Sequence, residues 1–388
     1  MANELFKAFK AFKASELHDK NINFLIGSGA SASYIPTLKI NDDLTYEDLL
    51  TDNNYSDINN FIYYQYYKNI LKKSFCFLPK ADDTRSRKSR RKTLNAYIQL
   101  IDSIVHLINR KGANQIRRAN IFTTNYDLFF ENASDRLLRD STNFIFNDGA
   151  RGLKKRHLQI SNFHTSTWHQ GTNDLYKFEI PTINLIKMHG SVSWNKYSEE
   201  RIEVNYPNHF PEVLEIDLDI PDIQTAVQLV EDFSFIETAK ESLNLAEKDE
   251  LALEEFRKEY NKLAIVNPTK AKFEETVFQQ HYYQSLRLLS YELEKPQTVL
   301  ICFGFSFKDE HIREIISRSL SNPSLIVYIF CYKNNDKTAI KELINNKKIV
   351  FIYPENDDEN NVIDLERFID CIFSLSGTDS MEGLTCSL

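Results

Sequence analysis

The stretch INFLIGSGASAS, residues 22–33, indicates the fold class, because a short apolar run leads directly into a glycine- and serine-rich turn. Residues 22–26 are continuously apolar, which is typical of a parallel strand buried on both faces. Gly27 and Gly29 permit a tight turn, and the N-terminus of a following helix would offer unpaired N–H groups to a pyrophosphate. The third glycine of the dehydrogenase fingerprint is absent, so a purely structural glycine turn is the alternative.

Further continuous apolar runs predict more strands of the same sheet. They are ANIFTTN (119–125), INLIKM (183–188), TVLICFGFS (298–306), SLIVYIFCY (324–332) and KKIVFIYP (347–354). Between them, apolar side chains recur at helical spacing over residues 94–108 and 278–293. Strands that alternate with helices predict an α/β fold with a doubly wound, Rossmann-like parallel sheet.

Two long segments interrupt this alternation, residues 40–118 and residues 195–272. The first is polar and rich in tyrosine, the second is acidic, and we expect both to be helical insertions. Together they would form a large, mostly helical inserted lobe on a single domain that spans residues 1–388. The Rossmann core would then comprise about residues 20–39, 119–194 and 273–375.

Composition and charge limit the classes of protein to which the chain can belong. Of its 388 residues, 42% are hydrophobic and 12% are aromatic, as in a globular protein. The formal net charge of -8 argues against a surface that binds nucleic acid as a whole. No apolar run reaches the roughly 20 residues that span a bilayer, so we expect a cytoplasmic protein without membrane contact.

One basic run, RSRKSRR at residues 85–91, continues into Lys92. A basic run with interspersed serines predicts a solvated, mobile loop. Contact with phosphate or nucleic acid is the alternative, either through this basic loop at 85–92 or through a protein partner.

The cysteines and histidines predict no metal site. The five cysteines include no CxxC pair, so neither a disulfide framework nor a four-cysteine zinc site is expected. Cys302 and Cys331 lie in apolar runs and are expected in the core. His157, His164 and His169 lie close together in sequence but match no ligand spacing.

Two aromatic-rich segments bear on assembly. Phe6, Phe9 and Phe12 alternate with lysines, which predicts an amphipathic helix packed on the body of the protein. Residues 59–71, NNFIYYQYYKNIL, carry more aromatic surface than one helical lobe needs, which is typical of contacts between proteins. The alternative is that these tyrosines pack the lobe onto the sheet.

Polar residues close the second and third strands, at the edge where open α/β sheets bind ligands. Asn125 offers a directional amide and Asp127 a carboxylate, although an Asp at this position is often only the N-cap of the next helix. His189 follows the third strand, where a hydrogen-bonded structural histidine is the alternative to a catalytic one.

The first and fourth strands add further groups at the same edge. Ser31 in the glycine turn would contribute a hydroxyl to a phosphate site. Gly304 and Ser306, in the run GFSFKDEHI, would line a ribose or phosphate, and Asp309 would cap the helix that begins there.

The order of these motifs resembles the sirtuin family, in which each motif closes a strand of a Rossmann-type fold. The matching residues are GSGAS (27–31), TTNYD (123–127), HG (189–190) and GFS (304–306). The resemblance implies NAD as the ligand, with catalytic roles for His189, Asn125 and Asp127. It implies NAD-binding roles for nine further residues: Gly27, Ser28, Gly29, Ala30, Ser31, Thr124, Gly190, Gly304 and Ser306.

Two departures from the family pattern bear on the reaction. The segment YIPTLK (34–39) lacks the Phe–Arg of the deacylases, and the four-cysteine zinc module is missing. The chain is more similar to sirtuin-like effectors of bacterial antiphage defence, of the type that works beside a HerA-like hexameric ATPase. That similarity implies an NAD hydrolase that releases nicotinamide and ADP-ribose and so depletes NAD. It also implies a homo-oligomer.

For this reaction His189 would act as a general base on water or on a ribose hydroxyl. Asn125 would orient the carboxamide or the water, and Asp127 would hold nicotinamide in a strained pose. Two other functions stay open. One is an NAD-dependent protein deacylase or ADP-ribosyltransferase, and the other is a non-catalytic scaffold that binds NAD or ADP-ribose.

Overall fold

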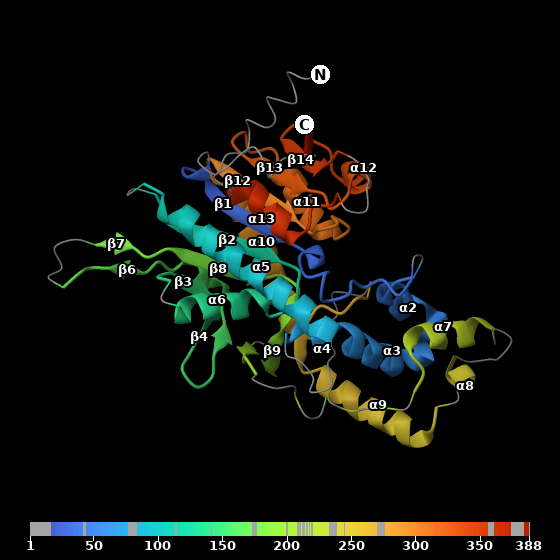
Figure 1. Cartoon of the computed structure of the whole chain (residues 1–388). Coiled ribbons are helices and arrows are strands. Elements are labelled where there is room, and N and C mark those ends of the chain that lie inside the picture. The colour runs from blue at the N-terminus through green and yellow to red at the C-terminus, as the bar shows by residue number, and fades with distance from the viewer. Residues whose placement is uncertain are drawn as a thin grey trace.

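The computed structural model describes residues 17–41, 44–76, 84–112, 115–140, 142–172, 177–198, 201–207, 211, 214, 216, 218, 220–232, 239–243, 245–269, 276–355, 361–373 and 384–387. The amphipathic helix expected around Phe6, Phe9 and Phe12 lies outside these residues. Figure 1 shows a central sheet with helices on both faces and a further group of helices to one side.

All of the predicted strands form, and they pair in parallel in one sheet. They are β1 (Asn21–Ile26), β2 (Arg118–Thr123), β8 (Thr182–Lys187), β12 (Thr298–Phe303), β13 (Ile326–Phe330) and β14 (Ile349–Pro354). Their spatial order is β8-β2-β1-β12-β13-β14, which in chain order is 3-2-1-4-5-6, the order of Rossmann-type sheets. β3 (Ile145–Asn147) extends the sheet in parallel beside β8, and β15 (Leu384–Ser387) pairs antiparallel with β14. The predicted α/β fold with a parallel sheet is confirmed.

Helices cover both faces of this sheet (Figure 1). One face carries α5 (Thr84–Asn109), α6 (Phe129–Arg139) and α13 (Leu365–Phe373), and the other carries α10 (Thr276–Glu294), α11 (Glu310–Ser319) and α12 (Asn334–Leu343). Neighbouring strand residues point into different cores, as Phe24 and Leu25 do. Burial on both faces is the reason that these strands are continuously apolar, since each such side chain contributes roughly 1.5–3 kcal/mol of hydrophobic stabilisation.

A second sheet stands beside the end of β8 and was not predicted. Its order is β11 (Leu263–Ile265), β9 (Gly190–Ser198), β10 (Arg201–Val204), β5 (His157–Leu158) and β4 (Ala150–Arg151), and β6 (Trp168–His169) pairs separately with β7 (Phe178–Glu179). The segment 195–272, expected to be helical, therefore begins and ends in strands. Most of these strands have two to four residues, too few for a period to be read from the sequence.

The remaining helices come from the two long segments and contact each other. They are α2 (Tyr46–Thr51), η3 (Asn53–Ile58), α3 (Asn59–Tyr66), the π-helical turn η4 (Tyr67–Leu71), α4 (Lys72–Ser74), α7 (Ile223–Asp232), α8 (Ala239–Leu243) and α9 (Glu247–Tyr260). A short 3₁₀ turn, η5 (Ile160–His164), lies outside this group. Figure 1 shows α3 alongside α9, at some distance from the central sheet.

The tyrosines of residues 59–71 are buried within this group of helices. The rings of Tyr63 and Tyr260 lie 5.2 Å apart, and the Arg257 guanidinium lies 3.3 Å from the centre of the Tyr63 ring. Tyr64 packs edge-on against Phe256. The interpretation of this stretch as a surface for contact between subunits is therefore wrong, because α9 of the same chain already covers it.

The basic run at 85–92 is helical rather than a loop. It forms the first turns of α5, whose later residues are buried against the sheet. Arg and Lys are good helix formers, and a helix extends readily once a packed segment has nucleated it. The helix nucleated by the buried later residues of α5 therefore extends back over the basic run.

The described residues contain no helix that is long and apolar enough to cross a membrane. Cys302 and Cys331 are buried in the core, as predicted, and Cys76 and Cys371 are also buried as free thiols.

His281 of α10 joins that helix to the central sheet. Its Nε2 lies 3.2 Å from the carbonyl oxygen of Lys187 at the end of β8, and its ring packs edge-on against Trp194 of β9. Burial lowers the pKa of His281 from 6.5 to about 4, because the imidazolium form would lose its hydration. The fold therefore favours the neutral ring.

We predict that His281→Gln loses less stability than the wild type as the pH falls from 6.5 to 4. In this range the unfolded state binds a proton at His281 and the folded state does not. The contribution of the neutral ring is therefore complete above pH 6.5 and is lost towards pH 4, at up to about 1.4 kcal/mol per pH unit. Urea unfolding of both proteins measures the effect, and parallel stability curves would contradict it.

Candidate active site

Two glycine turns meet between β1 and β12, where the strand order changes direction. The Gly29 N–H donates to the Gly304 carbonyl oxygen at 3.0 Å, and the Gly27 N–H donates to that of Phe303, also at 3.0 Å. A Cβ on Gly27 would lie 2.3 Å from the Gly304 oxygen, and Gly304 itself has a φ of +64°. The contact between the two turns therefore requires these glycines, whether or not a ligand binds.

The helix expected after the first turn is only a three-residue 3₁₀ turn, η2 (Ser28–Ala30). Within it, the N–H groups of Ala30 and Ser31 donate to the carbonyl oxygens of Gly27 and Ser28. These N–H groups are not available to a pyrophosphate. Cationic and hydroxyl side chains nearby would therefore contribute to binding a phosphate.

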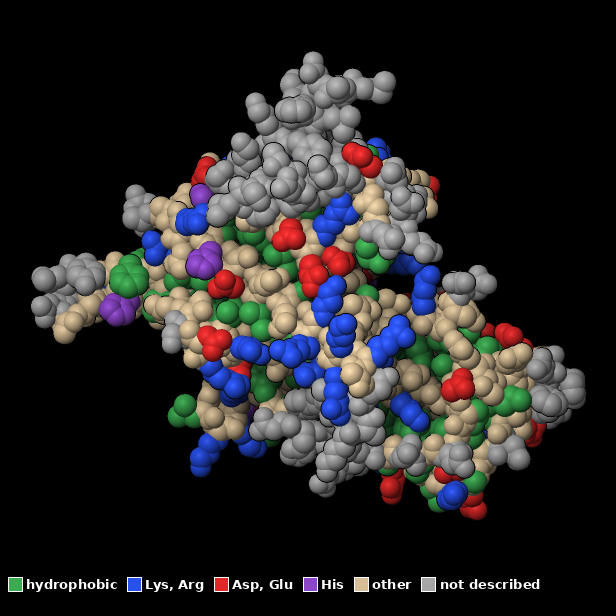
Figure 2. All heavy atoms as spheres, in the orientation of Figure 1, with side chains coloured by type: hydrophobic (Ala, Val, Ile, Leu, Met, Phe, Trp, Pro, Cys, Tyr) green, Lys and Arg blue, Asp and Glu red, His purple; other side chains and the backbone are tan. Residues whose placement is uncertain are grey.

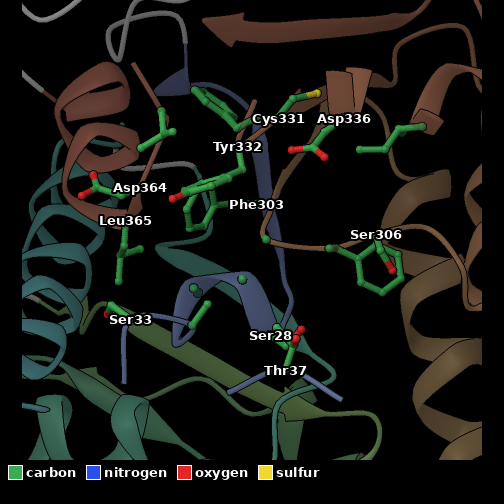
Figure 3. Close-up of a pocket in the computed structure, with 18 of the residues that line it drawn as sticks. Ser28, Ser33, Thr37, Phe303, Ser306, Cys331, Tyr332, Asp336, Asp364 and Leu365 are labelled. Carbon is green, nitrogen blue, oxygen red and sulfur yellow. The ribbon is translucent and has the colours of Figure 1, made fainter. Parts of the chain in front are cut away.

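A cavity of about 690 Å³ opens beside the glycine turns, at the carboxyl edge of the sheet (Figure 3). This volume is typical of sites that hold small molecules and cofactors. Five of the predicted NAD-binding residues line it: Ser28, Gly29, Ala30, Gly304 and Ser306. The other four lie outside its lining: Gly27, Ser31, Thr124 and Gly190.

The ends of β13 and β14 supply a part of the cavity that was not predicted. Tyr332 and Asp336 follow β13, and Asp364 stands just before α13. Figure 3 shows these three side chains around the space above Ser28. Ligands bind at the carboxyl ends of parallel strands, so residues that follow the apolar runs 324–332 and 347–354 could have been predicted to line a ligand site.

Two lysines give the cavity its cations. Lys308 follows β12, and Lys92 reaches the cavity from α5. Lys92 Nζ lies 3.1 Å from Glu366 and 3.8 Å from Asp364, so the two carboxylates at the start of α13 partly neutralise it. The cavity therefore offers both cations for phosphate groups and carboxylates for hydroxyl groups.

Three of the predicted residues form a buried polar cluster under the glycine turn. Ser31 Oγ donates to Asp127 Oδ2 at 2.7 Å and lies 2.8 Å from the Tyr97 hydroxyl, and the Asn125 amide donates to Ser31 at 3.4 Å. Asp127 Oδ1 also accepts the Phe129 N–H at 3.2 Å, at the start of α6. The N-cap residue of α6 is Leu128 rather than Asp127, so the alternative for Asp127 holds only in that its side chain accepts one N–H at the helix start.

A buried ion pair lies next to this cluster. Lys187 Nζ lies 2.9 Å from Glu131 Oε1 and also donates to the carbonyl oxygen of Asp127. Burial raises the pKa values of Asp127 and Glu131, and the Lys187 ammonium opposes both shifts. The Lys187 ammonium therefore favours the ionised form of both buried carboxyl groups.

His189 lies on the opposite side of the sheet edge and pairs with Asp309. Its Nε2 lies 2.9 Å from Asp309 Oδ2, while the other carboxylate oxygen caps α11 by accepting the Ile312 N–H at 3.2 Å. Asp309 thus has the predicted capping role and also orients His189. The His189 side chain keeps 13% of its surface exposed, which leaves it reachable.

The predicted catalytic residues therefore lie in two groups. Asn125 and Asp127 contact Ser31 and Tyr97 on the α5 side, whereas His189 and Asp309 lie beside Tyr282 of α10. Among the described residues, no hydrogen bond joins His189 to the first group. The amide oxygen of Asn125 is buried and has no hydrogen-bond partner, so a ligand or water would satisfy it.

No protein-family model and no curated protein matches this chain. The part of the chain that the structure describes holds no group of three or more His, Cys, Asp or Glu side chains placed to bind a metal ion.

We predict that Gly27→Ala destabilises the fold by about 1–3 kcal/mol, because its Cβ would overlap the Gly304 carbonyl. Gly112→Ala is the matched control, since a Cβ there meets only the far end of Gln115 at 3.9 Å. It should change stability by less than about 0.5 kcal/mol. Thermal and urea unfolding measure both variants, and equal stability of the two would contradict the role of the turn contact.

Proposed function

We propose that this protein hydrolyses NAD to nicotinamide and ADP-ribose. The observation that carries the proposal is the His189–Asp309 pair, which lies outside the cavity lining but directly follows a loop that borders the cavity at the switch point of a Rossmann-type sheet. Gly304, Phe305, Ser306 and Lys308 line that cavity, and Asp309 follows Lys308 in the chain. A base held by a carboxylate is therefore placed beside a site with the chemistry for a dinucleotide.

The lining of the cavity suits the ADP half of NAD. Lys308 and Lys92 would face the pyrophosphate, in place of the backbone N–H groups that the turn uses internally. Asp336 and Asp364 would accept ribose hydroxyl groups, and Tyr332 offers an aromatic face to adenine. NAD would then extend from this cavity across the end of β1 towards His189.

The bond that breaks joins the ribose C1′ to the nicotinamide nitrogen, and nicotinamide leaves as a neutral molecule. Water supplies the oxygen that bonds to C1′, and its proton passes to His189. Asp309 accepts the Nε2–H, so Nδ1 carries the lone pair that takes this proton. Asp309 also stabilises the imidazolium that forms, as a triad carboxylate does.

The buried cluster would serve this reaction from the other side. Asn125 would use its unpartnered amide oxygen to orient the nicotinamide amide or the attacking water. Asp127 would act as a positioning residue, because it contacts Ser31 and α6 and does not line the cavity. Ser31 would link the two and hold Asn125 in place.

The sirtuin resemblance supports the wider biological part of the proposal. It favours a sirtuin-like domain with α2–α4 and α7–α9 as an inserted lobe, whereas α5, also within residues 40–118, covers the central sheet. It also favours a homo-oligomer that works beside a HerA-like ATPase in antiphage defence. The buried tyrosines of residues 59–71 give no support to the oligomer, so that part depends on the resemblance alone.

We predict that His189→Ala lowers the rate of NAD hydrolysis by about two to four decades, the usual effect of removing a general base. NAD affinity should change little, because the base acts on the transition state. Asp309→Asn should also lower the rate, since an amide stabilises the imidazolium less. Release of nicotinamide and ADP-ribose without added peptide measures the rate, and calorimetry measures binding.

His106→Ala is the matched control, since His106 lies 3.6 Å from Asp102 on the exposed side of α5 and forms a similar pair away from the cavity. It should hydrolyse NAD at the wild-type rate. Undiminished turnover in His189→Ala would remove this residue from the mechanism. Tight NAD binding without turnover by the wild type would favour the non-catalytic scaffold, and a strict need for acyl-peptide would favour the deacylase.

A further inference from the structure

The basic run of α5 forms an exposed strip that the proposed reaction does not use. Arg85, Arg87, Lys88 and Arg91 are exposed in the first turns of the helix. Figure 2 shows Lys and Arg side chains gathered across the middle of one face, over this end of α5. The chain as a whole carries a net charge of -8, so this concentration of cations is local.

The other two cations of the run already have partners. Arg90 donates to the carbonyl oxygen of Cys76 at 3.1 Å, and Lys92 pairs with Glu366 at 3.1 Å. In the described segments of the chain, the four exposed cations form no ion pair with an acidic side chain. We call Arg85, Arg87, Lys88 and Arg91 the basic strip.

The basic strip works against the stability of the helix that carries it. The first turn of α5 has no acidic residue, and cations there oppose the helix dipole by about 0.3–1 kcal/mol each. Arg87 and Arg91 stand four residues apart, as do Lys88 and Lys92, and like charges at this spacing repel each other. An anion bound along the strip would remove both effects.

We propose that the basic strip binds the phosphate backbone of double-stranded nucleic acid. Arg87, Lys88 and Arg91 fall within five residues, and the four steps from Arg87 to Arg91 span about 6 Å of helix at 1.5 Å per residue. This density of about one charge per 2 Å matches duplex DNA, which carries one phosphate charge per about 1.7 Å of its axis. The proposed contacts are with phosphate groups, which carry no sequence information, so we expect binding to be independent of sequence.

The basic strip is separate from the candidate active site. The four residues of the strip do not line the cavity, whereas Lys92, one residue further along, does. Nucleic-acid binding therefore goes beyond the proposed NAD hydrolysis and does not depend on it. The two properties can fail independently in an experiment.

The test uses the full chain and a fluorescent DNA duplex of about 30 base pairs, with binding followed by anisotropy at about 50 and 200 mM salt. The variant R87Q/K88Q/R91Q removes three cations and keeps good helix formers. We expect the variant to bind at least about tenfold more weakly at low salt. We also expect its salt dependence to flatten by about 0.9 in slope for each phosphate that the variant no longer neutralises.

The matched control is K248Q/K258Q/K347Q, which removes the same charge from exposed lysines elsewhere. It should bind DNA within about twofold of the wild type, and the strip variant should still hydrolyse NAD at the wild-type rate. The proposal is overturned if the wild type does not bind the duplex or if the control loses as much affinity as the strip variant. Polyglutamate that binds the strip as tightly as DNA would overturn it in favour of an acidic protein partner.

Discussion

The backbone contact between Gly27, Gly29 and Gly304 holds the candidate active site together. In a sheet ordered 3-2-1-4-5-6, the connections after β1 and β12 leave towards opposite faces, and a space opens between them. Here direct hydrogen bonds from backbone N–H groups to carbonyl oxygens join the two turns and fix their relative position below this space. The joined glycine turns form one wall of the cavity, and the polar cluster of Ser31, Asn125 and Asp127 lies under the first turn.

The sequence predicted the central sheet well, because strands buried on both faces must be continuously apolar. It predicted the second sheet poorly, since strands such as β4 and β5 have two residues each and no readable period. The basic run was misread because charge pattern alone does not reveal that the packed half of α5 extends it as a helix. The tyrosines were misread for a related reason: their partner, α9, lies about 190 residues further along the chain.

Within the site, residues at strand ends were predictable and their pairings were not. His189 follows β8 and Asp309 follows β12, and β1 and β2 lie between these strands in the sheet. The pairing requires the loop after β12 to turn back across the sheet edge. Phe307 in that loop has a φ of +60°, a conformation that costs a bulky residue on the order of 1–3 kcal/mol. Such a turn cannot be read from the spacing of residues.

The polar cluster constrains which residues can carry chemistry. The buried Lys187 ammonium pairs with the Glu131 carboxylate and donates to the backbone carbonyl oxygen of Asp127, and removing one partner of a buried pair typically costs about 3–5 kcal/mol. Both oxygens of the Asp127 carboxylate already accept hydrogen bonds within the protein, from the Ser31 hydroxyl and the Phe129 N–H. His189 has one fixed partner, Asp309, and keeps 13% of its side chain exposed, so it stays reachable from solvent. In the proposed reaction, Asn125 and Asp127 on the α5 side of the sheet edge therefore position the substrate, and His189 on the α10 side transfers the proton.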